Sequence, residues 1–122
     1  MRTRLPLRLF LSAAAALTLS AGAITAVAQQ AQSLPTISLN AGIHVIKAQV
    51  AQSPDQREIG LMYRNSMPPN DGMLFVFEEP ATQCFWMKNT LLPLSIAFID
   101  DDGTIENIAD MAPMTENSHC SV

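Results

Sequence analysis

Positive charge is scarce in this sequence after its first residues. Of the seven Lys and Arg residues, three lie within the first eight positions, and only four follow residue 28, against eleven Asp and Glu. The region after residue 28 therefore has a net charge of -7. Nucleic acids and anionic membrane surfaces are bound mainly through Lys and Arg. The composition argues against both as partners of this region.

Groups that commonly carry catalysis are also few. The chain has two histidines, His44 and His119, and two cysteines. Neither Ser95 nor Thr90 lies in the glycine-flanked elbow that exposes a nucleophilic serine, and no histidine is near them in sequence. We therefore expect no enzymatic activity and no cofactor. An unrecognised hydrolase is the weakest alternative.

The first 28 residues have the three parts of a secretory signal peptide. Three arginines and no acid lie in the first eight positions, Leu9–Val27 contains no charged residue, and the segment closes with Ala26-Val27-Ala28. Signal peptidases read small residues at the minus-three and minus-one positions, so we expect cleavage after Ala28. An uncleaved anchor is the alternative, because the apolar run approaches the roughly 20 residues that span a bilayer. Cleavage predicts an exported protein, periplasmic or extracellular, with no stable membrane anchor.

Removing 28 of the 122 residues leaves 94, which is enough for one small domain. Residues 29–34 are mostly Gln, Ala and Ser, which predicts a disordered leader, and we expect the domain to span residues 35–122. A domain of this size buries only somewhat more than about 60% of the surface that its unfolded chain exposes. Its stability is therefore expected to be marginal.

A covalent link would add to that stability. Cys84 and Cys120 are the two cysteines, and an exported chain meets conditions in which disulfides form and persist. The even count predicts a disulfide between them, with free thiols as the alternative.

Local patterns predict a β-rich start and one short helix. Thr36–Leu39 and Ile43–Val50 are rich in β-branched residues and flank a turn, as in a hairpin, in which His44 faces solvent. Ser53 begins a capping box with Gln three residues later and Pro at the first helical position. A helix is therefore expected from Ser53 to about Met62, followed by a proline-containing loop over residues 68–72.

The second half of the chain contains four further strand-like runs. They cover residues 73–77, 84–87, 94–99 and 104–109. Asp102-Gly103 separates the last two, which favours a hairpin, and the acids before it lack the ligand spacing of a calcium loop. The sequence thus predicts a mainly β, single compact domain, sandwich-like or barrel-like, with one short helix.

Three motifs make the sequence resemble a known family. They are Gly60-Leu61-Met62-Tyr63-Arg64, then Asp71-Gly72-Met73-Leu74-Phe75-Val76-Phe77, then Phe85-Trp86-Met87-Lys88-Asn89-Thr90 with Pro93-Leu94. In this order they resemble the DUF192 family, also called UPF0127, of small and often exported proteins. The resemblance runs from about Ile43 to Val122. It implies a compact, mostly β domain and supplies no established activity.

Two departures from the family pattern matter. Many members have Asp after Pro-Leu, where this chain has Ser95, so a role for that carboxylate is not expected here. Similar members also continue well past the equivalent of Val122 with further strand-like sequence. The resemblance therefore implies a domain that is incomplete at its C-terminus, with C-terminal strands missing.

Polar groups recur beside large apolar ones in these motifs, as a pocket for a small polar ligand requires. Trp86 would supply a stacking surface and Arg64 an anion contact. The structural alternative is an ion pair between Arg64 and Asp71 that pins the proline loop, with Asn89 and Thr90 bonding a turn. The candidate ligand-binding residues are Arg64, Asp71, Trp86, Lys88, Asn89 and Thr90.

A second functional alternative is a copper site near the C-terminus. Thioether, imidazole and thiolate groups together suit Cu(I), and the chain offers Met111, Met114, His119 and Cys120 within ten residues. Cys120 cannot ligate while it is bonded to Cys84. The main hypothesis is therefore an exported, non-catalytic accessory or ligand-binding domain whose partner is a small ligand or an envelope protein. A periplasmic copper-handling protein is the alternative.

Overall fold

The computed structural model describes residues 14–23 and 29–122. The expected signal-peptide cleavage site after Ala28 lies outside the described residues, as does most of the predicted signal peptide. Within the described part of the chain, no helix has both the length and the apolar character needed to cross a membrane.

The first sheet is built around its middle strand. β1 (Thr36–Ala41) and β2 (His44–Ala51) form the predicted antiparallel hairpin, and His44 is solvent-exposed as expected. β3 (Asp71–Phe75) pairs with the other edge of β2 in parallel. Parallel neighbours need a crossover connection, and the segment carrying the helix supplies it.

The helix α1 (Pro54–Ile59) begins where the sequence predicts and ends earlier. The Ser53 side chain accepts a hydrogen bond from the Gln56 amide, and the Gln56 side chain accepts from the Ser53 amide, so the capping box is confirmed. The predicted end at about Met62 is wrong, because the helix ends at Ile59. It stops because Gly60 has a φ of 49°, where the chain turns close to Phe75.

The segment before β1 is attached to the domain, although residues 29–35 form no helix or strand. The side-chain Nε2 atom of Gln32 donates to the carbonyls of Gln56 and Gly60 at 2.8 and 2.9 Å. The Leu34 amide donates to the side chain of Gln49 at 2.9 Å. Part of the segment predicted as a disordered leader therefore satisfies carbonyls at the end of α1.

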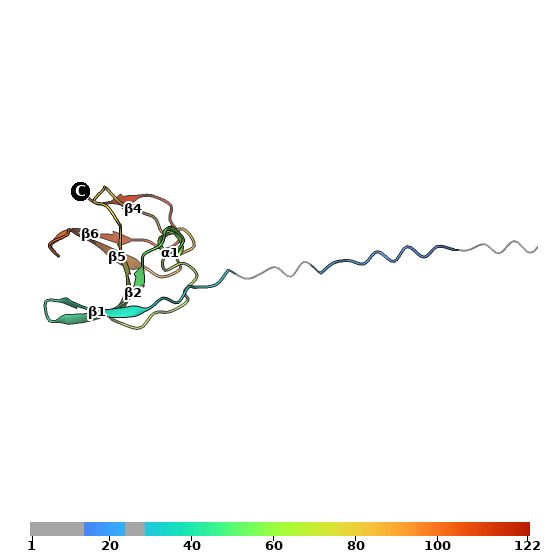
Figure 1. Cartoon of the computed structure of the whole chain (residues 1–122), viewed down its shortest axis with the longest axis horizontal. Coiled ribbons are helices and arrows are strands. Elements are labelled where there is room, and N and C mark those ends of the chain that lie inside the picture. The colour runs from blue at the N-terminus through green and yellow to red at the C-terminus, as the bar shows by residue number, and fades with distance from the viewer. Residues whose placement is uncertain (1–13, 24–28) are drawn as a thin grey trace, which may run out of the picture.

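A second sheet is the predicted hairpin of β5 (Leu94–Ile99) and β6 (Ile105–Met111). At its tip the Asp100 carboxylate accepts from the amides of Asp102 and Thr104 at 3.0 and 2.9 Å, and Gly103 takes a φ of 83°. The first acid of the tip, Asp100, therefore holds the turn. Figure 1 shows this hairpin beside the β1–β2 hairpin, with both tips at the same end of the molecule.

The third sheet contains two very short strands. β4 (Cys84–Phe85) pairs antiparallel with β7 (His119–Cys120), and Cys84 lies directly opposite Cys120. Their sulfur atoms are 2.10 Å apart, which confirms the predicted pairing. The strand predicted over residues 84–87 ends at Phe85, and β7 was not predicted.

Methionine and phenylalanine side chains form the centre of the core. Met87 is 1% exposed, and Met62, Phe98 and Met111 are also buried. Phe85 makes edge-to-face contacts with Phe98 and with two phenylalanines that end or follow β3, Phe75 and Phe77. Side chains from all three sheets thus meet around Phe85. The prediction of a mainly β fold with one short helix is confirmed.

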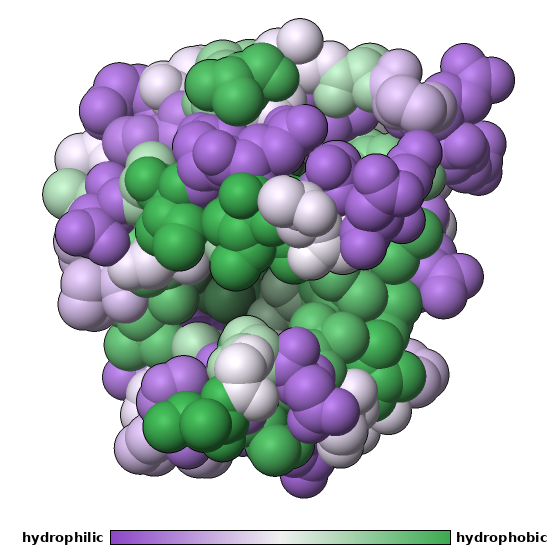
Figure 2. Space-filling view, turned by 90° about the vertical axis from the view of Figure 1, so that its left-hand side faces the viewer, coloured by the Kyte–Doolittle hydropathy of each residue, from purple (hydrophilic) through white to green (hydrophobic). Residues whose placement is uncertain are grey.

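The end of the molecule that carries the hairpin tips is hollowed and apolar. Figure 2 shows apolar side chains bordering a hollow on this face, with polar side chains around it. The exposed apolar residues of these strands include Val45, Ile99, Ile105 and Ile108. Apart from β2, every strand in the described residues has at least one edge without a partner strand.

Candidate functional site

The side chain of Trp86 is exposed because its neighbours are held inside. Phe85 packs against three other aromatic rings and Met87 is almost fully buried, so the residue between them faces the opposite way. Trp86 is 46% exposed. A large aromatic ring fixed at the surface is suited to contact a ligand or partner.

Two charged side chains accompany this ring. The Lys88 ammonium lies 5.2 Å from the centroid of the Trp86 ring, within the range of a cation–π interaction. The same Nζ atom is 3.9 Å from Oε1 of Glu116. An indole face, an ammonium and a carboxylate are thus adjacent on the surface. These three residues, Trp86, Lys88 and Glu116, are called the Trp86 platform below.

Backbone hydrogen bonds between three loops support the platform. The Met87 amide donates to the carbonyl of Thr115 at 2.9 Å, which ties the loop of Glu116 to that of Trp86. The Met114 amide donates to the carbonyl of Thr90 at 3.0 Å. The platform side chains therefore come from segments that are bonded to each other.

The third loop, which contains Tyr63, is bonded to the loop that contains Asn89. The Tyr63 amide donates to the Asn89 carbonyl at 2.9 Å, and the Asn89 side chain donates to the Tyr63 hydroxyl at 3.2 Å. Both residues have positive φ, 66° and 54°, and so has Met114, at 60°. Such backbone costs energy for residues other than glycine, and it persists where the surrounding contacts determine it. The hydrogen bonds between the loops provide those contacts.

Thr90, one of the predicted site residues, is buried and holds a turn. It is 5% exposed, and its hydroxyl donates to the Lys88 carbonyl at 3.1 Å. Its own amide donates to the carbonyl of Met87 at 3.2 Å. These bonds close the turn that carries Lys88 and Asn89, as the structural alternative predicted for Thr90.

The Arg64 side chain forms its hydrogen bonds with residues outside the Trp86 platform. Its Nη2 atom donates to the Gln32 carbonyl at 2.8 Å and to the Gln49 side chain at 3.0 Å, and its buried Nε atom has no partner among the described residues. Asp71 begins β3 opposite Lys47. Within the described part of the chain, neither a hydrogen bond nor an ion pair joins Arg64 to Asp71, so the predicted ion pair does not form. Arg64 instead holds the segment before β1 on the domain.

The residues of the copper hypothesis differ in accessibility. Met111 is buried at the end of β6, whereas Met114 is 57% exposed. The Nε2 atom of His119 is buried without a hydrogen-bond partner among residues 14–23 and 29–122, and the sulfur of Cys120 is bonded to Cys84. Cys120 therefore cannot act as a thiolate ligand in this state. No group of three or more His, Cys, Asp or Glu residues suited to a metal occurs among the described residues.

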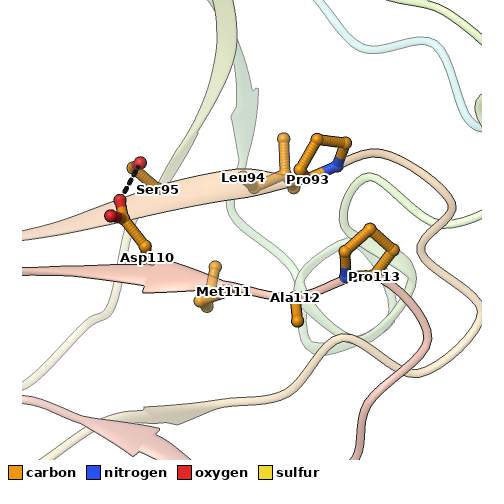
Figure 3. A pocket seen from close by; sticks show the side chains of 7 residues that line it. All are labelled: Pro93, Leu94, Ser95, Asp110, Met111, Ala112 and Pro113. Carbon is orange, nitrogen blue, oxygen red and sulfur yellow. Dashed lines mark hydrogen bonds between the residues drawn. The ribbon is translucent and has the colours of Figure 1, made fainter.

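A separate open hollow of about 500 Å³ lies where the β5–β6 hairpin joins its loops (Figure 3). The Ser95 hydroxyl donates to Oδ1 of Asp110 at 2.6 Å across the two strands. The Asp110 carboxylate therefore lies beside Ser95, the position at which the family resemblance implies Asp in many members. The hollow is lined by Pro93, Leu94, Ser95, Asp110, Met111, Ala112 and Pro113.

Two residues of the site were missed by sequence reasoning. Tyr63 lies within a recognised motif, but its bond to Asn89 depends on the tertiary arrangement of two loops. Glu116 lies in a polar segment outside the motifs, and nothing in its surroundings indicates that it approaches Lys88. The disulfide of the nearby Cys120 is the signal that could have directed attention to this segment.

Comparison with known families supports the resemblance seen in the motifs. The DUF192 family model, described as an uncharacterized ACR, matches residues 36–122. Among curated proteins, no sequence matches this chain.

Two crystal structures are similar to this chain. A "putative transcription regulator" from Sinorhizobium meliloti has 47% sequence identity and a TM-score of 0.63, over 64% of this chain and 61% of that protein. A protein of unknown function from Novosphingobium aromaticivorans has 29% identity and a TM-score of 0.65, over 70% of this chain and 64% of that protein. The chain thus spans less than two thirds of the length of either protein.

Proposed function

This chain belongs to the DUF192 family, and we propose that it is an exported, non-catalytic domain that binds a small ligand at the Trp86 platform. The observation that carries the proposal is the fixed and exposed Trp86 ring beside two charged side chains. Ligand sites combine an apolar surface with a few placed polar groups, and the platform has this composition. Its loops are held by hydrogen bonds that need no ligand.

Export is supported by the sequence and by the cysteines. The first 28 residues have the pattern of a cleaved signal peptide. The bonded Cys84–Cys120 pair fits an oxidising compartment, periplasmic or extracellular. The same proposal applies if the partner is an envelope protein that contacts the exposed Trp86 ring.

The description of one similar protein as a regulator of transcription is not extended to this chain. DNA binding depends on a basic surface, and residues 29–122 contain four Lys and Arg residues. Three of them are engaged within the molecule: Arg57 over the Phe77 ring, Arg64 with Gln49, and Lys88 with Glu116. Lys47 alone is a weak basis for a nucleic-acid surface.

Native mass spectrometry of the exported protein tests the proposal. We expect a chain that begins at Gln29, has a mass two hydrogens below that of the dithiol form, and retains a small molecule. Trp86→Leu should lose that molecule, whereas Ile43→Ala, at an exposed hairpin tip, should keep it. An intact Met1 terminus in the membrane fraction would contradict export. Equal retention by Trp86→Leu and wild type would contradict the site.

Copper handling is the second candidate function, favoured by the unpartnered Nε2 atom of His119 and the exposed Met114. Because Cys120 is bonded, the thiolate becomes available only after reduction. Cu(I) should therefore bind the reduced protein in a stoichiometric complex that Met114→Ala weakens. Absence of binding by the fully reduced protein would remove this candidate.

A further inference from the structure

The position of the Lys88 ammonium indicates the class of ligand. It lies over an indole face and beside a carboxylate, which is the arrangement that recognises organic cations in proteins. We infer that the Trp86 platform binds an organic cation, a quaternary ammonium or an amine, and that Lys88 occupies the site as an internal substitute until such a ligand displaces it. The inference rests on the proposed function, because it names the ligand class of the same site.

The internal contact is weak enough to be displaced. The side chain of Lys88 is 48% exposed and that of Glu116 is 64% exposed, and their closest distance of 3.9 Å is at the long end for an ion pair. Exposed ion pairs contribute little because water and salt screen them. A ligand cation can therefore take the position of Nζ while Lys88 moves into solvent.

The backbone of Trp86 and of the segment before Glu116 is held without the Lys88 side chain. Trp86 lies between Phe85, which packs against three other aromatic rings, and the buried Met87. The segment of Glu116 is fixed through the bond from the Met87 amide to the Thr115 carbonyl. The backbone segments that carry the aromatic ring and the carboxylate therefore stay in place when Lys88 leaves, which lowers the cost of binding.

Charge favours a cation over an anion. The chain after residue 28 has a net charge of -7, which attracts positive ligands to its surface. An anionic ligand held by Lys88 would instead have to approach the carboxylate of Glu116. The two readings make opposite predictions for the removal of each charge.

Fluorescence titration with choline chloride distinguishes binding of a cation from binding of an anion. Trp86 is the one tryptophan of the chain, so its emission reports from the site itself. Sodium chloride at matched concentration controls for ionic strength. The neutral alcohol 3,3-dimethylbutanol has the shape of choline without its charge and controls for hydrophobic binding. The exported protein with its disulfide intact is used throughout.

Choline should change the Trp86 emission in a saturable way, and the alcohol should bind at least about tenfold more weakly because it lacks the cation–π attraction. Lys88→Gln should bind choline about threefold to fivefold more tightly, since the competing ammonium is gone. Glu116→Gln should bind it several-fold more weakly. Glu106→Gln, which removes an exposed acid on β6, serves as the matched control and should bind like wild type.

Four outcomes would overturn the inference. They are equal binding of choline and the alcohol, weaker choline binding by Lys88→Gln, no response in either wild type or Lys88→Gln, and a retained natural ligand without positive charge. The last outcome would leave the proposed function standing, because the platform would still hold a ligand. Absence of any retained ligand together with absence of any emission change would overturn both.

Discussion

At the scale of single residues, the loops around the Trp86 platform are held in costly backbone conformations. Tyr63, Asn89 and Met114 all have positive φ. Asn adopts this region more readily than most residues, whereas Tyr and Met gain nothing locally from it. The cost is offset by bonds between the loops, so Asn89 and Tyr63 should contribute measurably to stability.

Asn89 allows the backbone and side-chain contributions to be separated. Asn89→Ala should destabilise the domain by about 2 kcal/mol, because it adds backbone strain to the loss of the bond to Tyr63. Asn89→Gly should cost about 1 kcal/mol less, since glycine accepts the positive φ. Tyr63→Phe removes the same hydrogen bond and should resemble Asn89→Gly. Urea unfolding of the three variants measures the difference; equal losses for Ala and Gly would contradict the role of φ.

Gly60 combines a positive φ with close packing. A Cβ atom at this position would meet Cζ of Phe75 at 3.1 Å, whereas one at Gly42, which also has positive φ, would meet nothing within 4 Å. Gly60→Ala should therefore destabilise the domain by about 2–4 kcal/mol and Gly42→Ala by about 1 kcal/mol. Thermal unfolding of both variants tests this. A loss at Gly42 as large as that at Gly60 would show that packing against Phe75 adds nothing.

The sequence predicted part of this site at the residue scale. Trp86 and Lys88 are two positions apart in a recognised motif, so their shared location follows from the chain itself. Glu116 and Tyr63 reach the site through long-range bonds that no local pattern encodes. For Arg64, the motif predicts ligand binding or an ion pair with Asp71. In the structure its hydrogen bonds go to Gln32 and Gln49.

At the scale of elements, α1 depends on its first turn. It has six residues and no buried side chain, so packing contributes little and the capping box accounts for its start. Ser53→Ala should destabilise the domain by about 1 kcal/mol, whereas Asp55→Ala, also in the first turn, should cost less than half as much. Denaturant unfolding measures both. Equal effects would indicate that first-turn charge, rather than the cap, starts the helix.

Elements with local signals were predicted closely, and elements that depend on distant partners were not. β5 has the predicted bounds because Pro93 precedes it and acids follow it, and the hairpin to β6 turns at the predicted Asp-Gly. β3 begins two residues before the predicted start, since its pairing with β2 includes Asp71. β7 has two residues, and its existence depends on pairing with Cys84. No strand pattern within residues 112–122 indicates β7, although the predicted disulfide brings Cys120 to Cys84.

At the scale of the whole molecule, the disulfide is the strongest tie between β7 and the rest of the domain. The β4–β7 pair has only two residues in each strand, and the two cysteines are separated by 36 positions. Closing a loop of this size restricts the unfolded chain by about 3–4 kcal/mol. This is a large part of the stability of a small domain.

Reduction should therefore lower the melting temperature sharply. The Cys84→Ser, Cys120→Ser double variant should unfold at the temperature of the reduced wild type, and reductant should not change it further. Calorimetry with and without a dithiol reductant tests both statements. An unchanged melting temperature on reduction would show that β7 is held by its other contacts, such as the bond from the Ser121 amide to the Gln83 carbonyl.

The central place of β2 in its sheet has a consequence for how the molecule opens. Among the described strands, β2 alone is bonded along both edges, and Ala48 and Ala51 within it are almost fully shielded from solvent. Amide protons exchange with deuterium when their bonds open, so those of β2 should exchange last, at the rate of global unfolding. Those of β4 and β7 should exchange earlier in reduced protein than in oxidised protein. Exchange in β2 as fast as in β6 would mean that the sheets open independently.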